Sequence, residues 1–565
     1  MEQSNKDFGV LYGQKTSTDG DSLLIYSSYE DSKASPQTGD FIVLTPRDED
    51  GCKFLARVEA EIYDEDPIFR SQDKTLVAVH YARIAERDLS DRDKQKMFSY
   101  TYKVNILGKF ESNGKGFSTA VRKLPLVSYH ARHLTPREFT NIINASNESG
   151  QPIGSLCIGD EIQLEEKDIL FDVTKLKSKR TMVFAQSGFG KTNLIKSLLL
   201  SLVRDTSFGK LIFDLEGEYA FKSQNNHGLT DLEENVYKDN LIVYTDKNLE
   251  NEHQKNFKKG NVRIDFYRDF SVDDIAQSAT GLTSAGKTFL NYIASLNEQE
   301  DVKTFIGMIV DDSEHTKVRE HAYRKFASYF KEKNVKKPDN ELIEADVSQA
   351  NKSMLGGVIR KIKALSSMHE TSSSLVEDVL NYLKEGKTVI LDMSNKDNSE
   401  VSIISSTITK RLLDQNKASH IDSNKKAIET VIFIEEAQNV LSDEFVRSNA
   451  NTFVKVAKQG RKFGVGLVAI TQRPSSISEE IRSQAENYFV MHMSNSKDIK
   501  ALVDSNNNYR GVISRFIQNE SISGNLYMLS TGQSFVVPVR VNWFEGEIKD
   551  KVSDTLRFPD EFYKK

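Results

Sequence analysis

Residues 181–192 read Thr-Met-Val-Phe-Ala-Gln-Ser-Gly-Phe-Gly-Lys-Thr and lead into the helical sequence NLIKSLLLSLV. An apolar strand, a glycine-bearing turn and a helix, in this order, are the context that a phosphate-binding loop requires. Gly188 and Gly190 allow backbone N–H groups to converge on phosphate oxygens beside the positive end of the helix. Ala185 stands where the usual G-x-x-x-x-G-K-S/T pattern has its first glycine, a mild change because the side chain is small and unbranched. These residues predict a nucleotide site rather than an ordinary glycine turn.

The same segment carries the side chains expected to contact ATP and Mg²⁺. Lys191 is expected to reach the β and γ phosphates, and the Thr192 hydroxyl is expected to bind Mg²⁺. The predicted nucleotide-binding residues are Ser187, Gly188, Phe189, Gly190, Lys191, Thr192 and Asn193.

A second motif is the run Val431-Ile-Phe-Ile-Glu-Glu-Ala-Gln438, four apolar residues that end in two carboxylates. If this strand ends at the carboxyl edge of a sheet, Glu435 can bind the metal and Glu436 can orient and deprotonate the attacking water. Alone, such a run is often just a strand leaving the core. The phosphate loop upstream favours the catalytic interpretation.

Two further motifs leave alternatives open. Residues 460–464 (GRKFG) lead into the apolar run 465–471 and then Gln472. Gln472 could sense the γ phosphate from the end of this strand. An alternative of about equal weight is that it is an ordinary strand end, whose polar groups form hydrogen bonds in the turn. Arg461 is either a solvated cation or a finger onto a neighbouring subunit's phosphates.

Residues 211–219 (LIFDLEGEY) place Asp214, Glu216 and Glu218 just after the next apolar run. These carboxylates could lie within reach of a metal at the phosphate loop. Taken alone, the segment fits a glycine turn with surface acids better.

Composition narrows the class of protein without deciding it. At 565 residues, two or more domains are expected, since single cores stop growing at about 250–300 residues. The net charge of −6 and pI near 6.0 argue against a uniformly basic surface, although a local basic stripe would not show in the total. Cys52 and Cys157 form no zinc or disulfide pattern, and no apolar run could span a membrane. A soluble protein of the reducing cytoplasm, with no membrane partner, is expected.

The pattern of apolar and polar residues along the chain predicts an α/β fold made of several parts. Residues 1–150 alternate as β-strands, notably at 54–62 and 100–106, and predict a small N-terminal β-barrel. Residues 151–274 and 386–545 alternate short apolar strands with helices and predict one parallel sheet covered on both faces. Residues 275–385 predict a helical insertion, and 546–565 form a C-terminal extension. The core strands are expected near 181–185, 210–214, 241–244, 262–265, 387–392, 430–434, 465–471 and 487–492.

Several motifs together resemble the HerA family of the HerA–FtsK superfamily. They are I-G-S-L (153–156), the phosphate loop with Asn193, D-x-x-G-E-Y (214–219), Glu435-Glu436-Ala437, G-R-K (460–462), T-Q-R-P (471–474), Gln484 and the terminal strand 535–541. The N-terminal runs 39–44 and 54–62 are similar to that family's barrel. The sequence departs from the family pattern at Ala185, Gln438 and Met493.

The resemblance implies a RecA-like P-loop core and a homohexameric ATPase that grips double-stranded DNA in a central channel. It implies that Gln472 senses the γ phosphate and that Arg461 acts in trans. It also implies a separately encoded effector, namely a NurA-type nuclease, a sirtuin-type NADase or another nuclease, the last two in anti-phage systems. The alternative is a scaffold ring, in which nucleotide sets assembly and the barrel docks an effector. A related secretion ATPase is disfavoured by the N-terminal barrel and the lack of membrane segments.

Overall fold

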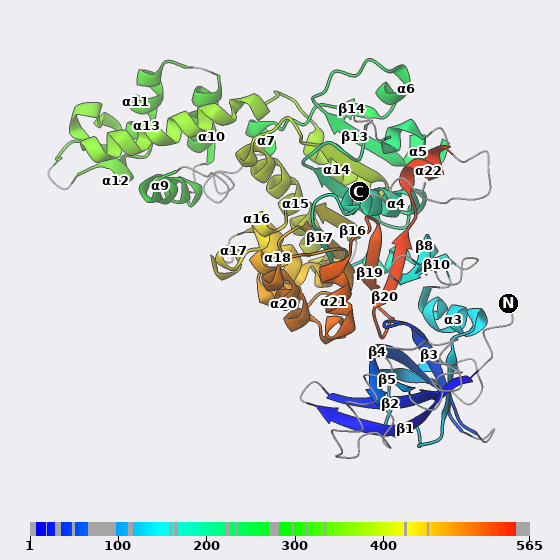
Figure 1. Cartoon of the computed structure of the whole chain (residues 1–565). Coiled ribbons are helices and arrows are strands. Elements are labelled where there is room, and N and C mark those ends of the chain that lie inside the picture. Colours follow the sequence, from blue (N-terminus) through cyan, green and yellow to red (C-terminus); the bar gives the residue numbers. More distant parts are fainter. Residues whose placement is uncertain are drawn as a thin grey trace, which may run out of the picture.

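A computed structural model gives the fold and the side chains of most of the chain (Figure 1). The residues that it describes are 7–17, 20–28, 36–47, 51–65, 98–110, 117–147, 149–158, 161–162, 168–221, 227–232, 235–269, 282–296, 299–311, 313–332, 335–422, 426–448 and 451–549. Within these ranges, no helix is long and apolar enough to cross a bilayer.

The N-terminal part is a closed barrel of antiparallel strands. Its strands are β1 (Asp7–Ser17), β2 (Gly20–Ser28), β3 (Phe41–Thr45), β4 (Phe54–Glu65), β5 (Phe98–Phe110), β6 (Phe117–Ser118) and β7 (His130–His133). The order is β2-β1-β7-β3-β4-β5-β6, and a further pairing of β2 with β5 closes the ring. Alternate side chains such as Val58 and Val104 fill the interior. The predicted barrel is therefore present.

The rest of the chain is built on a 13-stranded sheet with a parallel centre. Its strands are β8 (Gln151–Ile158), β9 (Glu161–Ile162), β10 (Asp168–Phe171), β11 (Arg180–Phe184), β12 (Gly209–Asp214), β13 (Leu241–Thr245), β14 (Lys258–Gly260), β15 (Thr388–Asp392), β16 (Thr430–Ile434), β17 (Val465–Thr471), β18 (Asn487–Val490), β19 (Asn525–Leu529) and β20 (Val537–Val541). The order is β10-β8-β20-β19-β18-β11-β17-β16-β12-β15-β13-β14, with β9 paired to β8.

Helices cover both faces of this sheet, as the continuous apolar strands require. Successive residues of β11 point to opposite faces, so Met182 and Val183 pack in different core clusters. The helices of this part are α3 (Pro136–Ile143), α4 (Lys191–Arg204), α5 (Asn235–Asn240), α6 (Glu252–Lys255), α7 (Phe266–Asp269), α14 (Leu375–Lys384), α15 (Asn398–Ile421), α16 (Gln438–Leu441), α17 (Asp443–Ser448), α18 (Thr452–Gln459), α19 (Glu479–Arg482), α20 (Ser496–Ser505), α21 (Val512–Asn519) and α22 (Phe544–Lys549). The predicted α/β fold with a P-loop core is confirmed.

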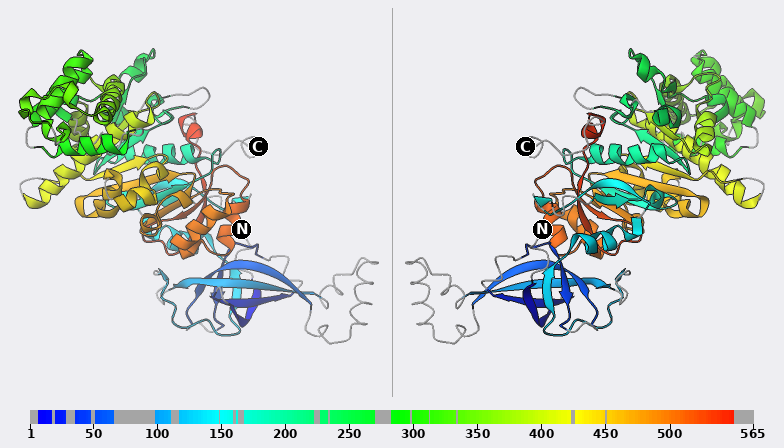
Figure 2. Two further views of the ribbon diagram at one scale, coloured as in Figure 1. Left: turned by 90° about the vertical axis from the view of Figure 1, so that its left-hand side faces the viewer. Right: turned by 90° about the vertical axis from the view of Figure 1, so that its right-hand side faces the viewer.

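A group of helices projects from the sheet where the sequence predicted a helical insertion. It holds α9 (Ser284–Ala294), α10 (Gln299–Val310), α11 (His315–Lys325), α12 (Ala327–Phe330) and α13 (Gln349–Ala364). Figures 1 and 2 show these helices at one end of the molecule and the barrel at the other, with the sheet between them.

The prediction of a strand at 262–265 is wrong, because the structure has no strand there. The edge strand is β14 instead, which pairs in parallel with β13. Val262 and Ile264 are buried as an apolar strand would be, but their backbone groups have other partners. The N–H of Val262 donates to Asp246 at 3.0 Å, and Ile264 exchanges backbone bonds with Met368 and Glu370. These partners lie outside the sheet, so the segment does not extend it.

The barrel is attached to the sheet through the segment between β19 and β20. Phe535 packs against Phe41 and Phe117 of the barrel, with ring centroids 5.6 and 6.0 Å apart. The buried guanidinium of Arg57 donates to the carbonyl of Val536. Burial lowers the pKa of Arg57 to about 10. The barrel and the strand β20 are therefore one packed unit at this junction.

Candidate active site

The predicted phosphate loop joins β11 to α4 at the carboxyl edge of the sheet. Gly188 and Gly190 have φ angles of 85° and 96°, values that glycine adopts without strain. Ala185 is buried, and its N–H bonds to the Thr471 carbonyl at the end of the neighbouring strand. A methyl side chain is thus accommodated at the position where the usual pattern has glycine.

A loop from the other end of the chain supports the phosphate loop. The N–H of Gly524 donates to the Phe189 carbonyl at 3.1 Å, and the Ser523 hydroxyl donates to the Gly188 carbonyl at 3.1 Å. The Phe189 ring lies against His492, with centroids 4.1 Å apart. These contacts hold two of the loop's carbonyls, and the N–H of Phe189 donates within the loop to the Gln186 carbonyl at 3.4 Å.

Asn193 has a structural role in addition to the predicted nucleotide contact. Its side-chain amide donates to the Asn542 carbonyl at 2.8 Å, and its carbonyl oxygen accepts the N–H of Phe544 at 2.9 Å. The side chain therefore ties α4 to the segment after β20. Ser187 is exposed on the loop.

Lys191 and Thr192 each meet a carboxylate. The ammonium of Lys191 lies 3.9 Å from Glu435 Oε1. The Thr192 hydroxyl donates to Glu218 Oε2 at 2.6 Å. Glu218 comes from the segment that, taken alone, looked like a turn with surface acids.

That turn, residues 214–219, is built around a buried aspartate. Asp214 is fully buried, and its two oxygens accept the N–H groups of Gly217, Glu218 and Tyr219 at 2.8, 3.2 and 3.0 Å. Gly217 has a φ of 68°, a conformation that suits glycine. Burial, together with the nearby Glu435, raises the pKa of Asp214 to about 7. Asp214 holds the turn, and the turn presents Glu218.

The turn also contacts the second carboxylate motif. The Tyr219 hydroxyl donates to Glu435 Oε1 at 2.5 Å, and the N–H of Leu215 donates to Glu435 Oε2 at 3.2 Å. Burial raises the pKa of Glu435, while the Tyr219 hydrogen bond and the Lys191 charge oppose that shift. Glu435 is therefore a buried carboxylate with fixed orientation.

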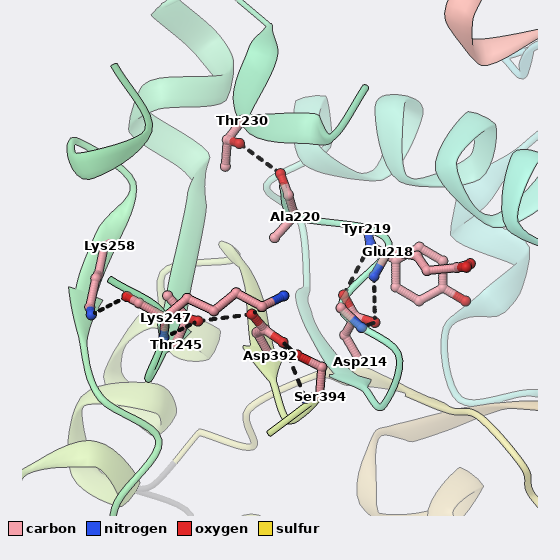
Figure 3. A network of polar contacts seen from close by, with 11 residues as sticks. Asp214, Glu218, Tyr219, Ala220, Thr230, Thr245, Lys247, Lys258, Asp392 and Ser394 are labelled. Carbon is pink, nitrogen blue, oxygen red and sulfur yellow. Dashed lines mark hydrogen bonds and ion pairs between the residues drawn. The ribbon is translucent and has the colours of Figure 1, made fainter. Parts of the chain in front are cut away.

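Figure 3 shows the polar network beside this turn. Lys247 pairs with Asp392 at 3.0 Å, and Thr245 and Ser394 donate to the same carboxylate at 2.8 and 2.7 Å. A Cβ on Gly217 would lie 2.5 Å from the Lys247 ammonium. The network packs directly against the turn at Gly217.

Glu436 begins the turn after β16 and has a φ of 46°, unusual for a residue with a side chain. Gln472 follows β17 at the same edge of the sheet and is half-buried. The structure therefore brings Lys191, Thr192, Glu435, Glu436 and Gln472 to one edge, as predicted from the parallel strands.

Arg461 does not join them. It lies just before β17, at the opposite edge of the sheet, where its guanidinium is 3.9 Å from Glu486 and its side chain is 70% exposed. The strand β11 separates the two edges by roughly 13 Å, at about 3.3 Å per residue. Arg461 cannot reach the phosphate loop of its own chain.

The oxygen atoms of Thr192, Glu435 and Glu218 are the hard donors that Mg²⁺ prefers, so the residues present fit this ion. Among the described residues, no three carboxylate, imidazole or thiol side chains form a ready-made metal cluster. Magnesium commonly binds through one or two carboxylates and the phosphates of the substrate. The phosphates of a bound nucleotide would add to the donors of Thr192 and Glu435 at such a site.

The sequence raised Asp214 and Glu218 as possible neighbours of a metal but favoured a turn with surface acids, and it gave Tyr219 no role. The D-x-x-G-E-Y spacing was visible, but only the fold places Glu218 on the phosphate loop and Tyr219 on Glu435. The available signal was the glycine within D-x-x-G-E-Y, since glycine is the usual residue where the backbone needs a positive φ.

Taken together, the strand order, the glycine turn and the two carboxylate motifs define a P-loop nucleotide hydrolase. Residues 153–412 match the family described as "Helicase HerA, central domain", and residues 367–509 match "Zonular occludens toxin (Zot)".

Two curated relatives cover most of the chain. A probable helicase of Methanocaldococcus jannaschii is 22% identical over 527 residues, covering 91% of this chain and 88% of its own. The DNA double-strand break repair helicase HerA of Sulfurisphaera tokodaii is 26% identical over 429 residues, covering 74% of this chain and 75% of its own. The chain belongs to the HerA–FtsK superfamily and is an ATP hydrolase of the HerA kind.

A solved structure, the bacterial conjugative coupling protein TrwBdeltaN70 with sulphate, matches with a TM-score of 0.42 and 13% identity, covering 69% of this chain and 95% of its own. This likeness is low, so the fold assignment rests on the strand order and the loop geometry.

Proposed function

We propose that this chain is a Mg²⁺-dependent ATPase that couples hydrolysis to movement on double-stranded DNA, as a homohexamer working with a separately encoded effector. The observation that carries the proposal is the single site in which the phosphate loop, the β16 carboxylates and the turn 214–219 meet. Relatives named as helicases support the coupling to DNA.

In the proposed reaction, water attacks the γ phosphorus, the bond to the β-phosphate oxygen breaks, and Glu436 accepts the proton of the water. Lys191 binds the β and γ phosphates, together with the N–H groups of residues 187–193. Mg²⁺, held by Thr192 and Glu435 with Glu218 beside them, would neutralise phosphate charge. Gln472 senses the γ phosphate from the end of β17.

We place Arg461 on the site of a neighbouring subunit. Its exposure and its position at the far edge of the sheet support action in trans, because its own phosphate loop is out of reach. A guanidinium supplied across an interface stabilises charge on the γ phosphate that the loop alone does not. This arrangement requires an assembly, and a homohexamer is the form we propose.

For the effector, the candidates are a NurA-type nuclease, a sirtuin-type NADase or another nuclease, and an anti-phage setting follows for the last two. The barrel carries exposed apolar side chains on one loop, with Leu126 and Val127 61% and 62% exposed. Exposed apolar side chains grouped in this way support contact with another protein.

The second candidate function is a scaffold ring, in which nucleotide sets assembly and the barrel docks the effector without processive movement. The acidic net charge of −6 favours it, as does the same exposed loop.

The experiment that separates the two is a measurement of ATP turnover and DNA affinity across salt concentrations. If duplex phosphates are gripped, affinity should fall by roughly 10³- to 10⁵-fold between about 50 and 200 mM salt for 6–10 phosphate contacts, and long double-stranded DNA should stimulate turnover. Glu436→Gln serves as the control that binds but does not hydrolyse. Turnover indifferent to DNA but responsive to a protein partner would favour the scaffold.

A further inference from the structure

We propose that Gln438 is a positioning residue, which holds the carboxylate of Glu436 and ties it to the end of β17. The inference rests on the proposed role of Glu436 as the base. It comes from a short chain of hydrogen bonds that joins the turn after β16 to the residue just before Gln472.

The direction of each hydrogen bond in this chain is fixed by chemistry. An ionised Glu436 can only accept, so the amide nitrogen of Gln438 must face it and donate to Oε2. The amide oxygen of Gln438 then faces Thr471, whose hydroxyl donates to it at 2.6 Å. The Thr471 oxygen in turn accepts the N–H of Arg473 at 2.9 Å. All four groups are satisfied in only one orientation of the amide.

The backbone supports the same function. Glu436 has a positive φ of 46°, a left-handed conformation that strains a residue with a side chain. Two backbone bonds hold the turn, from the N–H of Ala437 to the Ile470 carbonyl and from the N–H of Asn439 to the Glu436 carbonyl. These bonds fix the main chain of Glu436 but leave its side chain to rotate. Gln438 supplies the contact that fixes the side chain.

The chain of bonds also reaches the proposed sensor. Gln472 lies between Thr471 and Arg473, the residues that form its last link. A shift of Gln472 on contact with the γ phosphate would act on Thr471 and Arg473, its direct neighbours in the chain. Through Gln438, the position of the β17 end would then set the position of the Glu436 carboxylate.

The test is steady-state ATP turnover of the full chain, with ATPγS affinity measured separately by calorimetry. Gln438→Met keeps the length of the side chain and removes both polar groups. Thr471→Val removes the hydroxyl, and Thr471→Ser restores it. Gln349→Met, an exposed glutamine at the start of α13 in the helices that project from the sheet, is the matched control.

We expect Gln438→Met and Thr471→Val to lower kcat roughly ten-fold or more, a part of the 10²–10⁴ that a general base contributes. KM and ATPγS affinity should stay within about two-fold, since ground-state binding is untouched. Thr471→Ser should recover most of the lost rate. The double variant should be no slower than Gln438→Met alone, because both act through one chain of bonds.

Three results would overturn the proposal. One is a wild-type kcat in Gln438→Met, and another is strictly additive losses in the double variant. The third is full turnover in Glu436→Gln, measured in parallel. It would show that Glu436 is not the base, so that Gln438 would have no base to position. If Gln438→Met keeps the wild-type kcat while Glu436→Gln is inactive, Gln438 does not position Glu436. The proposed role of Glu436 as the base then still holds.

Discussion

Glu436 and Lys191 reach the same edge of the sheet from different strands, and their expected roles can be separated by substitution. Glu436→Gln should bind ATP normally but lose turnover by about 10²- to 10⁴-fold, because a neutral amide cannot accept the proton of the attacking water. Lys191→Ala should weaken nucleotide binding itself, since it removes a charge from the phosphates. Nucleotide affinity and phosphate release, measured on both variants, distinguish the two effects. Full turnover in Glu436→Gln would remove this residue from the reaction.

Lys210 offers a residue-scale prediction for pH. It is buried on β12, where its ammonium donates to the carbonyls of Asp205 and Gly386, and burial lowers its pKa to about 8 from 10.5. The folded protein thus loses this proton before the unfolded chain does. Stability should therefore rise between about pH 8 and pH 10.5 because the unfolded state binds more protons there.

The measurement is the Tm of the wild type relative to Lys210→Met across that range. Methionine cannot titrate, so it removes the contribution of this one group and leaves those of all others. A Tm difference that does not change with pH would show that Lys210 keeps its ordinary pKa.

The phosphate loop and the β16 carboxylates could be predicted from sequence because their chemistry is set by local order: strand, turn and helix, or strand and acid. The partners of these residues could not be predicted. Glu218 meets Thr192 and Tyr219 meets Glu435 only because α4, β12 and β16 pack together. Gln438 looked like a departure from a family pattern, and its contact with Thr471 depends on how two strands end.

At the scale of elements, the turn 214–219 contacts both Thr192 of the phosphate loop and Glu435 after β16. Loss of its contact with Glu435 should weaken metal binding. Tyr219→Phe deletes the hydroxyl that orients Glu435. Loss of a partner of this kind typically costs about 10- to 100-fold in metal affinity or activity. We expect weaker Mn²⁺ binding in the presence of ATPγS, measured by electron paramagnetic resonance.

Tyr292→Phe, in the helices that project from the sheet, is the matched control, because it also loses one hydroxyl hydrogen bond. Unchanged Mn²⁺ affinity in Tyr219→Phe would show that Glu435 needs no orienting partner. A loss equal to that of Tyr292→Phe would point to stability rather than to the metal.

The elements themselves were largely predictable because buried parallel strands are short, apolar and bounded by turns. The strand expected at 262–265 was wrong for a physical reason. Val262 and Ile264 fit the apolar pattern of a strand. Their N–H groups, however, donate hydrogen bonds to the Asp246 side chain and the Met368 carbonyl, which lie outside the sheet. Periodicity reports burial and does not report which group accepts a hydrogen bond.

At the scale of the whole molecule, the C-terminal strands connect distant parts of the chain. Gly524 contacts the phosphate loop, Phe535 packs on the barrel, and Asn542 binds α4. A change at the nucleotide therefore has a packed route to the barrel, where we place the effector. The sequence suggested a terminal strand at 535–541 but not that it joins these three parts.

If Arg461 acts in trans, as we propose, a single chain would not complete its own site, and turnover would depend on assembly. Arg461→Ala should bind ATP nearly normally and hydrolyse it poorly, by about 10³- to 10⁵-fold as for other arginine fingers. Lysine should not replace it, since it lacks the planar fork of hydrogen-bond donors.

The most direct test is ATP turnover by rings that mix Arg461→Ala with Glu436→Gln subunits, co-expressed and verified by mass measurement. Each parent ring is expected to be inactive. In mixed rings, an interface that joins an intact Glu436 to the intact Arg461 of the next subunit is complete, so turnover should rise above both parents. Turnover at the wild-type rate by Arg461→Ala alone would contradict the account.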